Sequence, residues 1–181
     1  MKKSNQIIIS VLGAIFIFSI AFQLNVNRHL RNDEFKKEAG TNISNERTVP
    51  NFNKITVRHG IEVFFTQDSI TLVKVDAPEN TLPTIITKVE NGMLLIEKTQ
   101  QTKNGAIVKV FVSNNQLHVL KVSSGAYFET IGEVVGSNLA LEFSSDTRAN
   151  LALSYQSVQC KAASGSQIKF KGNTSTIEFT N

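Results

Sequence analysis

The segment LKVSSGA at residues 120–126 is followed by two related segments, LEFSSDT at 141–147 and CKAASGS at 160–166. A shorter segment, IEFTN, occupies residues 177–181. Each has an apolar–charged–apolar triplet, and in the three full segments small residues and a turn follow it. A unit of about 20 residues that contains only strand and turn predicts a solenoid in which each coil stacks on the previous one.

The turns of this repeat predict a regular row at one edge of the solenoid. The serine directly before the turn residue recurs in all three full segments, and these side chains are expected to stack in register: Ser124, Ser145 and Ser164. Gly125 and Gly165 permit left-handed backbone at the next position, and Asp146 tolerates it best among the replacements. Cys160 takes the place of Leu120 and Leu141, which predicts a buried small apolar side chain rather than a reactive thiol.

The chain from residue 49 onward alternates apolar and polar residues with a period of two, which indicates β-strands. Asn91-Gly92, between two such runs, is a strong signal for a hairpin. We find no convincing helix after residue 50. The most regular alternating runs supply the residues expected in the core: Val110, Phe111, Leu120 and Leu141.

Residues 7–24, IIISVLGAIFIFSIAFQL, form an uncharged apolar run after the short tail of residues 1–6. As a helix this run would be roughly 27 Å long, close to the thickness of the hydrocarbon layer. It is expected to be a signal-anchor with the tail in the cytoplasm; the alternative is a cleaved signal peptide, with the mature chain starting at Phe22. Residues 25–48 are polar and are expected to form a linker, followed by one domain over residues 49–181.

Charge excludes one class of function. The net charge is +4, but residues 49–181 hold twelve basic and eleven acidic side chains, so the basic pI does not describe a basic domain surface. Nucleic-acid binding needs clustered Lys and Arg in excess, and we therefore expect none.

Motifs for catalysis or cofactor binding are absent from the sequence. The three histidines have no metal-ligand spacing, and no GxSxG, P-loop or GxGxxG motif occurs. We expect no catalytic residue, no metal and no cofactor. Paired carboxylates for glycoside hydrolysis are the open alternative; the candidates are Glu129, Glu133, Glu142 and Asp146.

Three stretches together resemble a known bacterial family. These are FNKITVRHGIEVFFTQ (52–67), VDAPENTLPTIITKVENGMLLIEK (75–98) and the repeated coils described above. In this order they are similar to the head GIN domain of the auto-transporter adhesin family, over about residues 49–181. The resemblance implies a right-handed parallel β-helix-like fold, export from the cytoplasm and a role in adhesion. The turn Asp146-Thr147 departs from the family's typical Gly-Ala.

These observations predict an all-β, membrane-tethered module at the bacterial cell envelope, with its C-terminal domain outside the cytoplasm. It would bind an unknown protein or polysaccharide without catalysis. The weakly indicated binding residues are Ser124, Ser145, Ser164, Tyr127 and Arg148. The alternatives are a polysaccharide-active lyase or hydrolase on the same scaffold and an envelope regulatory module. The strand at residues 177–181 would leave an unpaired edge, through which two copies could associate.

Overall fold

The computed structural model describes residues 41–99, 106–163 and 165–180. Within these ranges the chain is all-β, as predicted, with a single short 3-10 helix, η1 (Leu82–Thr84). The strands are β1 (Asn42–Arg47), β2 (Lys54–Val57), β3 (Glu62–Gln67), β4 (Leu72–Pro78), β5 (Ile85–Glu90), β6 (Met93–Lys98), β7 (Lys109–Asn114), β8 (Val119–Ser123), β9 (Tyr127–Thr130), β10 (Val134–Ser144), β11 (Arg148–Ala162), β12 (Gln167–Lys171) and β13 (Thr174–Thr180).

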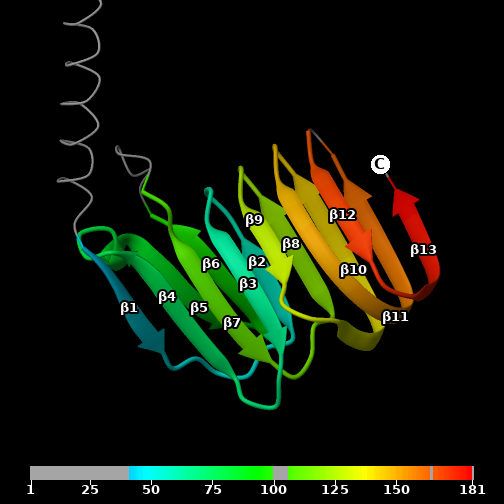
Figure 1. The fold of residues 1–181 in the computed structure, drawn as a ribbon, viewed down its shortest axis with the longest axis horizontal. Coiled ribbons are helices and arrows are strands. Elements are labelled where there is room, and N and C mark those ends of the chain that lie inside the picture. Colours follow the sequence, from blue (N-terminus) through cyan, green and yellow to red (C-terminus); the bar gives the residue numbers. More distant parts are fainter. Residues whose placement is uncertain (1–40, 100–105, 164, 181) are drawn as a thin grey trace, which may run out of the picture. The chain divides into compact units, whose positions relative to one another are not determined.

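The strands form two sheets (Figure 1). Sheet A has the order β1-β4-β7-β3-β9-β11-β12, and sheet B has the order β5-β6-β2-β8-β10-β11-β13. Strand β11 belongs to both, because residues 148–152 pair in sheet A and residues 153–162 pair in sheet B. The 13 strands therefore form one hydrogen-bonded network.

Parallel pairing stacks the repeats in register. Leu120 pairs with Leu141, which pairs with Cys160, as the sequence repeat predicted. Ile55 on β2 and Leu94 on β6 continue the same column on the other side of Leu120. All five side chains are buried, and Cys160 is a buried apolar contact whose thiol pKa is raised by burial.

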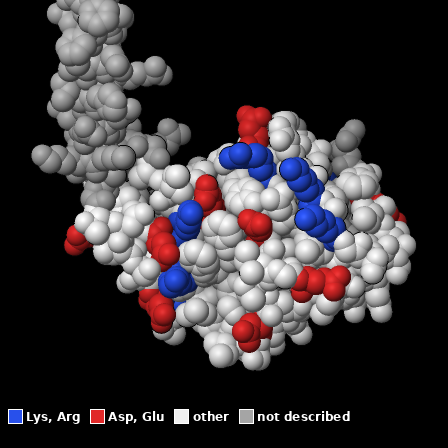
Figure 2. Space-filling model, viewed as in Figure 1, with Lys and Arg blue, Asp and Glu red and all other residues white. Residues whose placement is uncertain are grey.

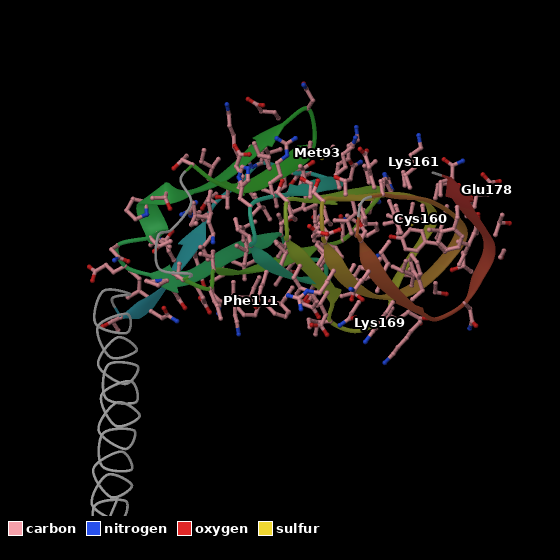
Figure 3. All side chains as sticks on the ribbon, turned by 90° about the horizontal axis from the view of Figure 1, so that it is seen from above. Met93, Phe111, Cys160, Lys161, Lys169 and Glu178 are labelled. Atoms are coloured by element: carbon pink, nitrogen blue, oxygen red, sulfur yellow. The ribbon has the colours of Figure 1, made fainter. Side chains whose placement is uncertain are left out.

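The core lies between the two sheets. Inward side chains from both form one apolar cluster, while the alternate side chains point outward. Figure 3 shows Cys160 inside, Phe111 and Lys169 on one outer face, and Met93, Lys161 and Glu178 on the other. Phe111 was therefore wrongly assigned to the core: Val110 is fully buried, and its neighbour on the strand must point to the opposite face.

The order of the coils departs from a simple solenoid. The coil β2–β3 lies between β6–β7 and β8–β9, so the coils do not stack in the order of the sequence. Strands β1, β4 and β5 add antiparallel pairings at one end. The β5–β6 hairpin turns at Asn91-Gly92, where both residues have positive φ, as its sequence indicated.

Two further expectations differ from the structure. Residues 42–47, which polarity placed in the linker, form β1; their side chains are almost all exposed, and the backbone pairs with β4. The last segment is shifted by two residues, because Phe179 rather than Ile177 pairs with Cys160. Ile177 pairs with Val158 instead, and a shift of two residues keeps the same side chains on the inward face.

The expected membrane segment, residues 7–24, lies outside the described residues. Within the described ranges, no helix is long and apolar enough to span a bilayer.

Candidate functional site

The outer face of sheet A carries two rows of side chains that cross the strands. Parallel register aligns Glu62, Tyr127, Arg148 and Gln167 on β3, β9, β11 and β12, with Lys109 of β7 beside Glu62. We call this the Tyr127 row. Two residues further along each strand lies the second row, the Phe64 row, which consists of Lys74, Phe111, Phe64, Glu129, Asn150 and Lys169.

The two rows enclose a shallow hollow of about 440 Å³ between β3 and β12. Its polar lining mixes both charges with amides and a phenol. The lining residues are Glu62, Tyr127, Arg148, Ala149, Asn150, Gln167 and Lys169.

A short hydrogen-bond chain fixes the centre of this hollow. Asn150 Nδ2 donates to Tyr127 Oη at 2.7 Å, and Tyr127 Oη donates to Glu129 Oε2 at 2.8 Å. The pKa of Tyr127 is raised, first by burial and then by its bond to the Glu129 carboxylate. The phenol therefore stays protonated and acts as a donor at neutral pH.

The basic side chains of this face form no ion pairs with other described residues. On one side Arg148, Lys169 and Lys171 are exposed on β11 and β12. On the other side, Lys74 Nζ lies 4.8 Å from the ring centre of Phe111, and Lys109 Nζ lies 6.0 Å from that of Phe64. In Figure 2, Lys and Arg side chains form two groups on the visible face, with acidic side chains among and between them.

The aromatic rings between the two groups form a ladder. Phe111 and Phe64 stack with centroids 5.3 Å apart, and Tyr127 meets Phe64 edge-on at 6.2 Å. The cation of Lys74 covers the other face of Phe111. Because the faces of Phe64 and Phe111 are occupied by their neighbours, these two rings offer a ligand mainly their edges, beside cations and hydrogen-bonding groups.

The structure brings together two of the five residues that the sequence indicated. Tyr127 and Arg148 are register neighbours in the hollow. Ser124 and Ser145 lie instead at exposed turns with positive φ, joined by the Gly125 N–H that donates to Ser145 O at 2.9 Å. Ser164 lies outside the described residues.

The remaining site residues were missed by sequence reasoning, although their signal was present. Alternation in β3 places Glu62 on the face opposite Val63, and alternation in β12 places Gln167 and Lys169 opposite Ile168. The repeat aligned β8 with β10 and β11, but it did not align β3 with β9, because the strands from β4 to β8 lie between them in the sequence. Without that pairing, Glu62 could not be placed beside Tyr127.

The acids considered for catalysis do not form one group. Glu142 pairs with Lys121 on the outer face of sheet B at 2.6 Å. Asp146 lies at a turn and its carboxylate packs against Gly165. Glu129 lies in the Phe64 row, next to the hollow, while Glu133 is exposed between β9 and β10. Among the described residues, no three His, Cys, Asp or Glu side chains are grouped so as to hold a metal.

Solved structures share this fold at low sequence identity. A "putative adhesin" from Parabacteroides distasonis has a TM-score of 0.64 at 18% identity, over 77% of this chain and 69% of that one. A "putative lipid binding protein" from the same species has a TM-score of 0.62 at 16% identity, over 75% and 68%. A "putative adhesin" from Bacteroides fragilis has a TM-score of 0.53 at 13% identity, over 77% and 97%.

The comparison with curated proteins gave no match. The family described as "Putative auto-transporter adhesin, head GIN domain" matches residues 51–181, which covers both sheets except β1. The chain therefore belongs to the head GIN domain family, as its repeated coils and its APEN-containing segment indicated.

Proposed function

We propose that this chain is a membrane-tethered binding module that acts in adhesion outside the cytoplasm, without catalysis. The ligand would bind the outer face of sheet A. One observation carries the proposal: the hollow on this face holds cations without ion-pair partners, next to a fixed set of hydrogen-bonding groups. Unsatisfied charge and oriented polar groups on a rigid sheet are what a polar ligand requires.

The relatives support the general class. The family description and two of the structures named above refer to adhesins. The other structure refers to lipid binding. Binding experiments should therefore compare any proposed ligand with a lipid head group. An open, shallow site suits the surface of an extended partner better than an enclosed small molecule.

The tether and the details of the scaffold belong to the same proposal. Residues 7–24 would remain as a single-pass anchor in the bacterial cell membrane. Residues 49–181 would lie outside the cytoplasm and form a right-handed solenoid. The full-length chain should stay in membranes washed with carbonate. A mature soluble protein that starts at Phe22 would contradict the anchor.

The binding role is tested with the full-length chain and cell-envelope fractions from which the protein has been removed. Charge removal on sheet A, by Arg148→Gln with Lys169→Gln, should weaken capture of the protein by these fractions. The matched variant removes two charges from sheet B, by Lys54→Gln with Lys161→Gln, and should bind as the wild type does. Equal capture of both variants would overturn the proposal.

A polysaccharide-active enzyme is the alternative, and one observation favours it. Glu62 lines the open hollow, and Glu129 lies next to the hollow on the neighbouring strand, where it accepts a hydrogen bond from Tyr127. Two carboxylates across a groove are the requirement for glycoside hydrolysis. Turnover of a polysaccharide by the wild type, lost in both Glu62→Gln and Glu129→Gln, would replace the proposal of a non-catalytic module.

We further propose that two copies associate through β13. Phe179 is 66% exposed, and in the described part of the chain β13 pairs only with β11. An unpaired strand edge with apolar side chains is a template for pairing with another chain. Sedimentation should show a dimer that Phe179→Lys dissociates; a monomer at high concentration would contradict the association.

A further inference from the structure

We infer that the ligand of the sheet A face is an acidic polysaccharide. Its acid groups would lie on the cations at the ends of the Tyr127 and Phe64 rows, and its hydroxyl groups on the polar side chains between them. This inference rests on the proposed function, because it names the ligand class of the same face.

The spacing of the cations requires an extended ligand. Neighbouring strands lie about 4.8 Å apart. Lys109 and Arg148 are three strands apart in sheet A, which places their backbones about 14 Å from each other. Lys74 and Lys169 are five strands apart, or about 24 Å. No small anion spans these distances, whereas a polymer laid across the strands meets both groups.

The centre of the rows determines which kind of polyanion fits. Glu62 and Glu129 lie between the two groups of cations, and they accept hydrogen bonds but repel negative charge. Asn150 and Gln167 add amides on the same face. A chain with an acid group on every residue and no hydroxyl groups would meet repulsion here. An acidic polysaccharide carries hydroxyl groups between its acid groups, and these can donate to the two carboxylates.

The same arrangement disfavours two other polyanions. Nucleic acids and anionic bilayers are bound mainly through their phosphates, and this binding needs an excess of positive charge over the whole contact. Insertion into a bilayer also needs protruding apolar side chains, but the two rows between the cations present half-buried rings packed in a ladder. Because the faces of Phe64 and Phe111 are covered, the sugar would be held mainly by charge and hydrogen bonds rather than by stacking on these two rings. Its binding should therefore weaken strongly with salt.

The inference is tested with polygalacturonate and the full-length chain in a mild detergent. The wild type should bind this polymer, should not bind neutral dextran, and should bind digalacturonate far more weakly because the dimer cannot reach both groups of cations. Arg148→Gln with Lys169→Gln should weaken binding roughly tenfold or more, because each lost contact is a hydrogen bond to a charged group. Lys74→Gln with Lys109→Gln should weaken it as well. The control, Lys54→Gln with Lys161→Gln, removes the same charge from sheet B and should change affinity by less than about twofold.

Three results would overturn the inference: equal losses in the sheet A and sheet B variants, equal affinity for dextran, or binding only to vesicles that contain phosphatidylglycerol. Circular dichroism checks that every variant keeps its strands. The two proposals can fail separately. Capture by envelope fractions that needs sheet A, without binding of polygalacturonate, would overturn only the ligand class. Binding of polygalacturonate through sheet A, without capture by envelope fractions, would overturn only the proposed role at the envelope.

Discussion

The outer faces of the two sheets differ in how many of their basic side chains form ion pairs. On sheet B, Lys121 pairs with Glu142 at 2.6 Å and Lys88 with Glu90 at 2.5 Å, and Arg58 lies 3.9 Å from Glu97. On sheet A, none of the described cations has an ion-pair partner, although Glu62 and Glu129 lie in the same rows. Two of these cations contact aromatic rings instead.

This difference separates the requirements of the fold from those of a site. Ion pairs on a surface contribute little to stability, so neither face needs them in order to fold. Pairing nevertheless reduces the charge that a face presents to a ligand. Sheet B therefore keeps only part of its positive charge available, as at Lys54 and Lys161, whereas none of the cations described on the outer face of sheet A is paired.

Two neighbouring phenylalanines on β3 provide the strongest test of how much the core and the outer face each contribute to stability. Phe65 is fully buried and stacks on Phe128, whereas Phe64 is half-buried in the outer ladder. Phe65→Ala should lower the free energy of unfolding by about 3–5 kcal/mol, because it leaves a cavity between the sheets. Phe64→Ala should cost only about 1–2 kcal/mol. Urea denaturation measures both; equal losses would mean that the outer ladder is as important to the fold as the core.

Tyr155 tests the point at which β11 passes from one sheet to the other. Its hydroxyl donates to Leu117 O at 2.7 Å, and burial raises its pKa to about 12. The unfolded chain loses this proton near pH 10, so the contribution is complete below that pH and is lost between pH 10 and 12. The loss should be about 2–3 kcal/mol.

Alkaline denaturation of the wild type and of Tyr155→Phe checks this expectation. The variant should be less stable at neutral pH and should lack the part of the pH dependence that Tyr155 causes. Absorbance of tyrosinate should show one phenol that titrates near pH 12. An unchanged pH profile in the variant would mean that this junction is open to water.

Gly136, near the start of β10, tests how tightly the same junction is packed. A Cβ atom at this position would collide with the ring of Tyr155. Gly136→Ala should therefore destabilise the protein by about 1–3 kcal/mol, as overpacking does. Thermal unfolding measures the change. In the background of Tyr155→Leu the same substitution should cost clearly less, and an undiminished cost would show that the ring is not the cause.

The smallest effect concerns the ion pair of sheet B. A double-mutant cycle on Lys121 and Glu142 should give a coupling energy of about 0.2–1 kcal/mol. The corresponding cycle on Lys109 and Glu62, which are in register on sheet A without an ion pair, should give a value close to zero. A larger coupling on sheet A would mean that its charges do pair in solution, and the contrast between the faces would disappear.

The parts of this fold that follow from local sequence were predictable. Alternation identified the strands, and the repeated triplets set Leu120, Leu141 and Cys160 in register. The dipeptides with positive φ marked the turns, including Ser124-Gly125 and Ser145-Asp146. His59-Gly60 is an equivalent turn, but its coil stands apart in the sequence and was not aligned with the others.

The parts that depend on distant pairing were not predictable. Nothing near β3 in the sequence indicates that it pairs with β7 on one side and with β9 on the other. For the same reason, only part of the site was predictable. Tyr127 and Arg148 come from adjacent coils of the repeat, whereas Glu62 comes from a coil far upstream. The predicted register of the last strand was also wrong, because a pattern of period two fits equally well after a shift of two residues.

The position of the β2–β3 coil has a consequence for folding. Both of its neighbours, β6–β7 and β8–β9, come later in the chain, so one edge of this coil waits for residues up to 114 and the other edge waits for residues up to 130. The coils of this domain therefore cannot stack one after another in the order of the sequence. Contacts between segments far apart in sequence slow folding and prolong the exposure of strand edges. The first strands of this chain therefore remain incompletely paired until the later coils have been made.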